Sequence, residues 1–423
     1  MTVEIDGANN IIKTNTINEV TSANGITIDG LNIKDSKLVT ANSVVEANIT
    51  NGAVTSGKIA SGVIPTLRPN VSPIIINGDM AVSQRATSST GQTASGYYTV
   101  DRMKLTASSL GTWTLAQEAQ TSGNAFLNGF ANAMRIDCTT ADASPSAGDF
   151  LAFCTYLEGQ DLQMFKKGGA NAETFTLAFW VKSNLTGNAQ VNLRDKDNTR
   201  MISSAYSISS ANTWEQKVLN FAKDTTGAFG DDNGRSFEIE WTLDSGSDFT
   251  SGAIPTAWEA TSNGDRNVNN LDVGGSTSND WSITGIQLEV GEFNSSTLPP
   301  FQHESFGANL ERCQRYYLRF QGDASDQRII ANGFTNSTSN IRAVVVFPTT
   351  MRTAGTITEA ALITLWNGGS SDAVSLTAAI DPATNAVLAS VTRDSGTPYT
   401  AGQAVTIRTT DSTDSFLAVD AEL

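Results

Sequence analysis

The stretch that decides the fold runs from Ile74 to Arg85 and reads IIINGDMAVSQR. Its apolar triplet is typical of the end of a buried strand, and the Asn-Gly-Asp cluster behind it is typical of a tight turn. Apolar and polar residues then alternate from Met80 onward, which indicates a second strand. This stretch therefore predicts β-structure on both sides of a turn.

Three later segments belong with this stretch. They are 285–292, which reads GIQLEVGE, 299–307, which reads PPFQHESFG, and 310–317, which reads LERCQRYY. Together with the NGDM and QR of 74–85, they resemble the jelly-roll domain of bacteriophage tail-fibre proteins and the LxxCQRYY connector that follows it. The resemblance covers 71–320. It implies a fold that looks like a carbohydrate-binding module.

The composition favours an all-β protein of two or three domains. The chain has 423 residues, 35 glycines and only 27 lysines and arginines, and it shows no long run of helix formers at helical spacing.

Its formal net charge of −16 argues against binding nucleic acid or an anionic membrane surface. No stretch approaches the roughly 18 apolar residues of a membrane span, and the first residues lack the pattern of a signal peptide. We expect synthesis in a cytosol.

A five-residue beat of apolar positions precedes the jelly-roll region. Ile28, Ile33 and Leu38 are spaced by five, and the beat continues at Val39, Val44, Ile49, Val54, Ile59 and Ile64. One apolar residue in five buries too little area for a single chain to order itself, but several identical chains can bury them on a shared axis. The pattern is similar to the stalks of phage fibres, which implies a homotrimer. A flexible linker with chance spacing and a pentapeptide-type β-helix are the alternatives.

These signals divide the chain into four parts. We expect a virion attachment segment at 1–27, an oligomeric repeat stalk at 28–70, a jelly-roll domain at 71–306, and a short helical connector with a smaller C-terminal β-sandwich at 307–423. Prolines at 65, 69 and 73 mark the boundary between stalk and globular part, because proline cannot donate to a strand ladder.

Within the jelly-roll region, the segment 174–182 alternates, which places Phe175, Leu177, Phe179 and Val181 on one face and Trp180 on the other. The apolar phase of 281–290 changes at Gly285, which predicts a β-bulge. Trp214 and Trp241 match core positions of the jelly-roll fold that the resemblance implies.

Sugar recognition uses aromatic faces stacked on pyranose rings, with amides bonding the hydroxyls. Four aromatic residues lie in settings that suit this role: Trp258, Tyr97, Tyr98 and Trp180. For each of them, packing in the fold is the competing interpretation. We therefore expect any ligand to be a host-surface glycan held by some of these side chains.

Catalytic and metal signals are weak. The chain has one histidine, His303, inside a strand-closing segment, so a Ser-His-Asp triad is not expected. The acidic residues offer too many candidate pairs for glycan cleavage to choose among. Turns 195–198 and 231–234 carry oxygen ligands that suit calcium, and jelly-roll modules often hold a structural calcium, but solvated turns are the default interpretation. The three cysteines, with no close pair, predict buried free thiols rather than a metal site or disulfide.

The sequence leads to a virion fibre protein, not an enzyme. The N-terminal segment 1–27 would contact other virion proteins, and the globular part would attach the particle to the host surface by binding glycan through many weak contacts. Two alternatives remain open: a capsid head-fibre, decoration or tail structural protein that binds no receptor, and a tail enzyme that cleaves polysaccharide.

Overall fold

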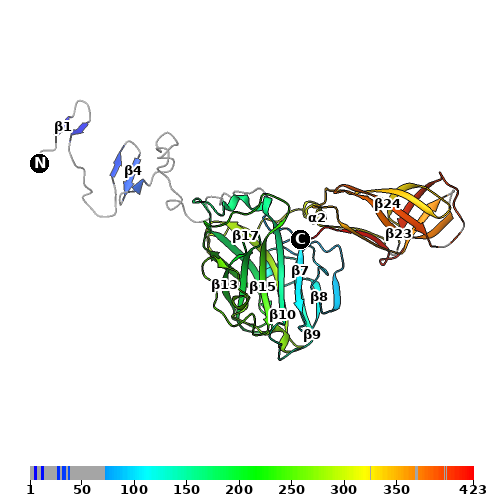
Figure 1. Ribbon diagram of the computed structural model, residues 1–423. Coiled ribbons are helices and arrows are strands. Elements are labelled where there is room, and N and C mark those ends of the chain that lie inside the picture. The colour runs from blue at the N-terminus through cyan, green and yellow to red at the C-terminus, as the bar shows by residue number, and fades with distance from the viewer. Residues whose placement is uncertain are drawn as a thin grey trace. The chain divides into compact units, whose positions relative to one another are not determined.

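The computed structural model describes residues 72–423 apart from 324, 367–369, 395 and 397, together with five short strands ahead of them (Figure 1). The chain forms two units, Met1–Pro65 and Thr66–Leu423. The strands of the first unit are β1 (Glu4–Asp6), β2 (Ile11–Lys13), β3 (Ile26–Ile28), β4 (Leu31–Lys34) and β5 (Lys37–Leu38).

The first unit contains two small antiparallel sheets, β1-β2 and β3-β4-β5. The first positions of the apolar beat fall on these strands, and Ile33 pairs in register with Ile26 on one side and with Leu38 on the other. The rest of the predicted stalk and most of the attachment segment lie outside the described residues.

The second unit begins with two six-stranded antiparallel sheets that face each other (Figure 1). One sheet has the order β16 (Glu259–Ala260), β13 (Arg200–Ile208), β12 (Gly187–Asp195), β15 (Arg235–Ser245), β10 (Phe150–Glu158), β7 (Met103–Ser108). The other has the order β14 (Glu215–Phe221), β11 (Phe175–Ser183), β17 (Asp280–Val290), β9 (Asn132–Thr140), β8 (Thr112–Ala119), β6 (Ser88–Gln92). This is a jelly-roll sandwich, so the expected all-β fold class is confirmed.

The core of the sandwich lies between the two sheets, where the inward residues of each strand alternate with outward ones. In β11, Phe175, Leu177, Phe179 and Val181 are all fully buried in this core, as the alternation predicts. Trp113, Trp241 and Trp281 are fully buried beside them. The predicted bulge is also present, because the register of β11 with β17 shifts between Ala178 and Trp180 opposite Gly285.

The stretch 74–85 is not a pair of strands, which corrects the sequence-based prediction. Asn77 and Met80 both have φ of 59°, and two left-handed residues so close together interrupt an extended backbone. The Asn77 amide takes the place of a ladder: its oxygen accepts from Val82 N at 2.9 Å, and its Nδ2 donates to the carbonyl oxygens of Val82 and Asp101, each at 2.9 Å. The segment is a buried turn held by one side chain.

Short helices connect the strands. They are α1 (Gly123–Leu127), the 3₁₀ helices η3 (Gly159–Phe165), η4 (Asn263–Asp265) and η5 (Val273–Gly275), and α2 (Phe306–Gln314) after the jelly roll. Helix α2 falls where the connector motif predicts a helix, and the Ser305 hydroxyl caps its N-terminus by accepting from Ala308 N at 3.3 Å. Among the described residues, no helix is long and apolar enough to cross a membrane.

The C-terminal part contains a closed barrel where the sequence predicted a small sandwich. Its strands follow the order β19 (Ile329–Thr335), β20 (Asn340–Val346), β24 (Ala386–Arg393), β23 (Ser370–Pro382), β22 (Leu362–Trp366), β25 (Ala404–Thr409). The ring closes because β25 pairs with both β22 and β19, which leaves no sheet edge. A three-stranded sheet adjoins it, in the order β18 (Tyr317–Gln321), β26 (Phe416–Asp420), β21 (Thr356–Ala360).

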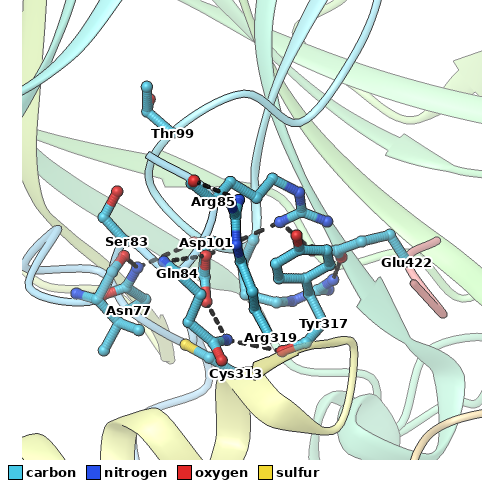
Figure 2. A network of polar contacts seen from close by, with 12 residues as sticks. Asn77, Ser83, Gln84, Arg85, Thr99, Asp101, Cys313, Tyr317, Arg319 and Glu422 are labelled. Carbon is cyan, nitrogen blue, oxygen red and sulfur yellow. Dashed lines mark hydrogen bonds and ion pairs between the residues drawn. The ribbon is translucent and has the colours of Figure 1, made fainter. Parts of the chain in front are cut away.

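A buried polar network joins the jelly roll to this three-stranded sheet (Figure 2). The Arg85 guanidinium lies 3.6 Å from the centroid of the Tyr317 ring and pairs with Asp420 at 3.0 Å and Glu422 at 3.4 Å. Gln84 Nε2 donates to Tyr317 O at 2.7 Å and to the Asp101 carboxylate. Burial raises the pKa of Asp101 to about 6, although Arg85 and Gln84 act in the opposite direction. These contacts fix β18 and β26 against the turn 74–85.

Candidate functional site

Trp180 lies on the outer face of the sheet that contains β11. Its neighbour Phe179 is fully buried in the core, whereas Trp180 projects to the other side and is only partly buried. Its register partners are Gln216 of β14 and Thr284 of β17. Trp180 therefore lies on the outer face one strand in from the sheet edge, flanked by β14 and β17.

A pocket of about 410 Å³ opens beside Trp180. Its floor comes from β11, β14 and β17, and its walls come from the residues that follow α1 and from the segment 295–303 that follows β17. The lining residues are Asn128, Phe130, Trp180, Gln216, Gly285, Gln287, Ser295, Leu298, Pro299, Pro300, Phe301 and His303. The volume lies in the range of small-molecule sites.

Three rings form one wall of this pocket. Phe130 packs edge-on against Phe301 with a centroid distance of 4.9 Å, and the His303 ring lies 5.4 Å from Phe130 and 4.8 Å from Phe301. His303 and Phe301 come from the PFQHES segment, and Phe130 comes from the turn after α1. Trp180 packs against the same apolar cluster. The pocket thus offers several aromatic surfaces at once.

Gly285 allows this wall to approach the sheet. It has φ of +62°, and a Cβ atom built on it would lie 2.7 Å from Cζ of Phe130. Real Cβ atoms do not approach other atoms that closely. The bulge at Gly285 is therefore also the place where the Phe130 ring reaches the backbone of β17.

The polar groups of the pocket are mostly amides. Gln287 Nε2 donates to Glu289 Oε1 at 2.8 Å and to the Pro299 carbonyl at 2.9 Å, which fixes the amide. Asn128 is exposed and its Nδ2 donates to Asn124 O at 2.8 Å. Gln216 and Ser295 are exposed as well. Amides can both donate to and accept from hydroxyl groups, so the pocket can bind a polyhydroxylated ring on its edges and its face.

The described residues that line the pocket include no aspartate, glutamate, lysine or arginine. In a chain with 43 acidic residues, this is a neutral patch. Ring stacking and hydrogen bonds, rather than ion pairing, are the interactions it can supply.

No protein-family model and no curated protein matches this chain. Among solved structures it is similar to the enzymatically active domain of tailspike protein 4 of bacteriophage CBA120, with 13% identity, a TM-score of 0.27, and coverage of 52% of this chain but 21% of that one. A putative sugar binding protein from Bacteroides thetaiotaomicron shares 16% identity over 52% of this chain and 100% of its own, with a TM-score of 0.26. A family 11 carbohydrate-binding module from Clostridium thermocellum, in complex with a mixed-linked tetrasaccharide, shares 10% identity over 49% and 91%, with a TM-score of 0.22.

This chain spans about a fifth of the tailspike chain. TM-scores this low carry no argument about the fold or the function, and the assignment of the jelly roll rests on the strand order and register described above.

The other three aromatic residues predicted to bind sugar lie outside this pocket. The Trp258 side chain is 9% exposed, and its Nε1 donates to Ala222 O at 2.7 Å, so its faces are taken up by packing. Tyr97 donates to Leu423 O at 3.1 Å, and Arg85 and Lys104 lie 5.3 and 5.4 Å from the centroid of its ring. Tyr98 packs on the core and donates to Ala94 O at 2.7 Å. Of the four, only Trp180 lines this pocket.

A lysine ammonium lies at one of the acidic turns considered for calcium. Lys167 Nζ bonds to Asp195, to Asp224 at 3.0 Å, and to the carbonyl oxygens of Thr226 at 3.1 Å and Gly227 at 2.7 Å. The side chains of Lys167 and Asp195 are fully buried. The ammonium already supplies the positive charge that these oxygens need, so they do not fit a calcium ion at the same position.

The second acidic turn bonds to backbone amides. Asp232 Oδ1 accepts from Gly234 N at 2.8 Å, which is the bond of an ordinary Asx-type turn. Asp197 of the first turn also bonds to backbone here, because its Oδ2 accepts from Gly230 N at 2.8 Å.

One further cluster has the composition of a metal site. Ligand atoms of Cys154, Glu238 and Glu240 lie within 4.8 Å of one another, and all three residues are buried. However, Arg266 and Arg194 hold the pKa of Glu240 at about 2 against the effect of burial, and burial raises the pKa of the Cys154 thiol well above its usual value. A protonated thiol beside carboxylates that already pair with arginines fits a structural ion-pair network better than a metal.

Most of the other pocket residues carry no recognisable signal in the sequence. Phe130, Gln216 and Ser295 belong to no motif, and they meet only through strand pairing and long connections.

All three cysteines are free and buried, as predicted.

Proposed function

We propose that this chain is a virion fibre protein that attaches a bacteriophage to its host by binding surface glycan in the pocket beside Trp180. The observation that carries the proposal is the pocket itself. It combines the Trp180 ring with other aromatic rings and exposed amides, and this combination suits the apolar face and the hydroxyl groups of a sugar ring. The resemblance of the NGDM, PFQHES and LERCQRYY motifs to phage fibre proteins supports the assignment to a virion.

The direct test is calorimetric titration of the full chain with polysaccharide purified from the surface of the host bacterium. We expect Trp180→Ala to weaken binding about tenfold or more, since loss of an aromatic anchor costs roughly 1–2 kcal/mol. Tyr98→Ala is the matched control, because Tyr98 is an aromatic residue of the same domain outside the pocket. If Trp180→Ala and the unaltered chain bind the polysaccharide with equal affinity, the pocket beside Trp180 is not the binding site.

We propose further that binding is not followed by cleavage. Glycoside hydrolysis needs a carboxylic acid beside the scissile bond, and the described residues that line the pocket include no carboxylate. Reducing ends should therefore not accumulate when the protein is incubated with the polysaccharide. Their steady release would favour the alternative of a tail enzyme.

Location on the virion is the remaining part of the proposal. Immunogold labelling of intact particles with an antibody against residues 72–423 should mark appendages at the tail. Gold spread over the capsid would instead favour a head-fibre or decoration protein.

A further inference from the structure

The barrel has an apolar strip on its outer surface. Four large apolar side chains point away from the barrel core: Phe334 of β19 is 51% exposed, Val344 and Val346 of β20 are 48% and 66% exposed, and Ile380 of β23 is 42% exposed. Soluble proteins seldom expose adjacent apolar side chains without a partner. We call these four residues the barrel strip.

Strand register shows that the barrel strip is continuous. Val344 pairs with Leu388 of β24, and Leu388 in turn pairs with Asp381, next to Ile380 at a bulge of β23. Val346 pairs with Ala386 in the neighbouring row. Directly paired residues share a face of the sheet, and diagonal neighbours are within reach of large side chains. Phe334 pairs directly with Arg342, and its diagonal neighbour on β20 is Val344. The strip therefore runs diagonally from β19 to β20 and reaches β23 through Leu388.

Opposite charges lie at the two sides of the barrel strip. Arg342 is on the β20 side, where it pairs in register with Phe334. Asp381 is on the β23 side. Among the described residues, no group of opposite charge lies within ion-pair distance of either one. A surface with an unpaired cation on one side and an unpaired anion on the other is complementary to another copy of itself.

We propose that the barrel strip binds a second copy of this chain, with the β19–β20 side of one barrel against the β23–β24 side of the next. In this arrangement Arg342 of one copy meets Asp381 of its neighbour. Contacts between two different patches close into a ring when the rotation permits. Each copy carries a formal net charge of −16, so two copies repel each other. The barrel strip has no excess of negative charge, which allows two copies to approach each other there.

The apolar beat at 28–64 would strengthen this contact. If several chains share one axis there, as the spacing predicts, their barrels are held at a high effective concentration, and a weak contact between barrels is then sufficient. The proposal concerns the barrel alone, so it stands or falls independently of glycan binding.

Disulfide trapping tests the contact in the full chain. Arg342→Cys and Asp381→Cys are introduced together, and the protein is oxidised and run on a non-reducing gel. Strands β20 and β23 are separated by β24, which places the two positions at least about 9–10 Å apart within one barrel. A disulfide needs Cα atoms within about 7 Å, so only different chains can be bridged. The native cysteines are buried and should contribute little background.

The matched control pair is Ser371→Cys with Thr406→Cys, which lie on β23 and β25, separated by β22 on the other side of the barrel. We expect covalent dimers and larger species from the first pair at a yield at least fivefold above the control. Adding Val344→Asp should reduce that yield to the control level. Equal yields from the two pairs, or an unchanged yield with Val344→Asp, would overturn the proposal.

Discussion

The buried guanidinium of Arg102 pairs with the carboxylate of Glu422, 320 residues further along the chain. Arg102 also lies 3.4 Å from the centroid of the Tyr316 ring and donates to Tyr156 O at 2.6 Å. Both charged side chains are nearly inaccessible to water, at 1% and 4% exposure. One ion pair therefore connects the jelly roll, the segment after α2 and the residues after β26.

Removing one partner of this pair should destabilise the fold strongly. We expect Arg102→Met to lower the free energy of unfolding by about 3 kcal/mol, the lower end for a broken buried pair, because the buried Glu422 carboxylate keeps only Arg85, at 3.4 Å, as a counter-charge. Urea unfolding measures the change. Arg135→Met is the control: Arg135 is 35% exposed and pairs with Asp137 at the surface, so its loss should cost at most about 1 kcal/mol. Similar losses of unfolding free energy for the two variants would contradict a stabilising role of the buried Arg102–Glu422 pair.

Asp101 should make stability depend on pH. Its pKa is about 6 in the folded chain and 3.8 as the ordinary value, so the folded state binds this proton more tightly than the unfolded state. The contribution of this group is largest below about pH 4 and falls by about 3 kcal/mol as the pH rises to about 6. Asp101→Asn should flatten the urea-unfolding stability curve over that interval. A variant with the slope of the unaltered protein would show that burial of Asp101 is not the cause.

Gly285 should tolerate no side chain. A Cβ at φ of +62° would collide with Phe130, so we expect Gly285→Ala to cost about 1–3 kcal/mol and to displace the aromatic wall of the pocket. Gly307→Ala is the control, since nothing lies within 4 Å of a Cβ there and α2 gains a better helix former. Thermal unfolding followed by circular dichroism compares the two. Equal midpoints would mean that the wall does not depend on the bulge.

Lys167 should be replaceable only by another cation. Lys167→Ala leaves the buried Asp195 carboxylate without its cation and Asp224 with Arg200 alone, at 2.8 Å, at an expected cost of about 3 kcal/mol. Calcium at millimolar concentration should raise the melting temperature of this variant but not that of the unaltered protein, because the vacated oxygens become available as ligands. Lys182→Ala removes a partly exposed lysine and should be insensitive to calcium. A calcium response in the unaltered protein would point to a metal site elsewhere.

Local patterns predicted the parts of this fold that depend on neighbouring residues. The alternation of β11 and the bulge at Gly285 follow from spacing within a few residues, the helix before Tyr317 follows from the connector motif, and all three are present. The turn at 74–85 could not be predicted from local patterns, because the Asn77 side chain forms the hydrogen bonds that a partner strand would otherwise form. Its apolar residues are buried, but burial alone does not distinguish a strand from a turn.

The site was predictable only in part, for the same reason. Trp180 could be placed on an outer face from alternation, but its pocket needs Phe130 and Phe301, which lie 50 and 121 residues away in the sequence. Trp258 sits among polar neighbours in the sequence and yet is buried, because its ring packs on the core near Phe175. Closure of the barrel likewise depends on pairing between β22 and β25, which no local pattern encodes.

The position of Asp420 and Glu422 also sets an order of events during synthesis. The ribosome completes all of the barrel before it adds the two carboxylates that neutralise Arg85 and Arg102. Until then Arg102 lacks its carboxylate partner and Arg85 has only Asp101, at 3.8 Å, so we expect the junction of the jelly roll with β18 to remain open. A chain interrupted anywhere in the barrel would keep that open junction, and protease sensitivity near residues 84–102 would distinguish incomplete chains from complete ones.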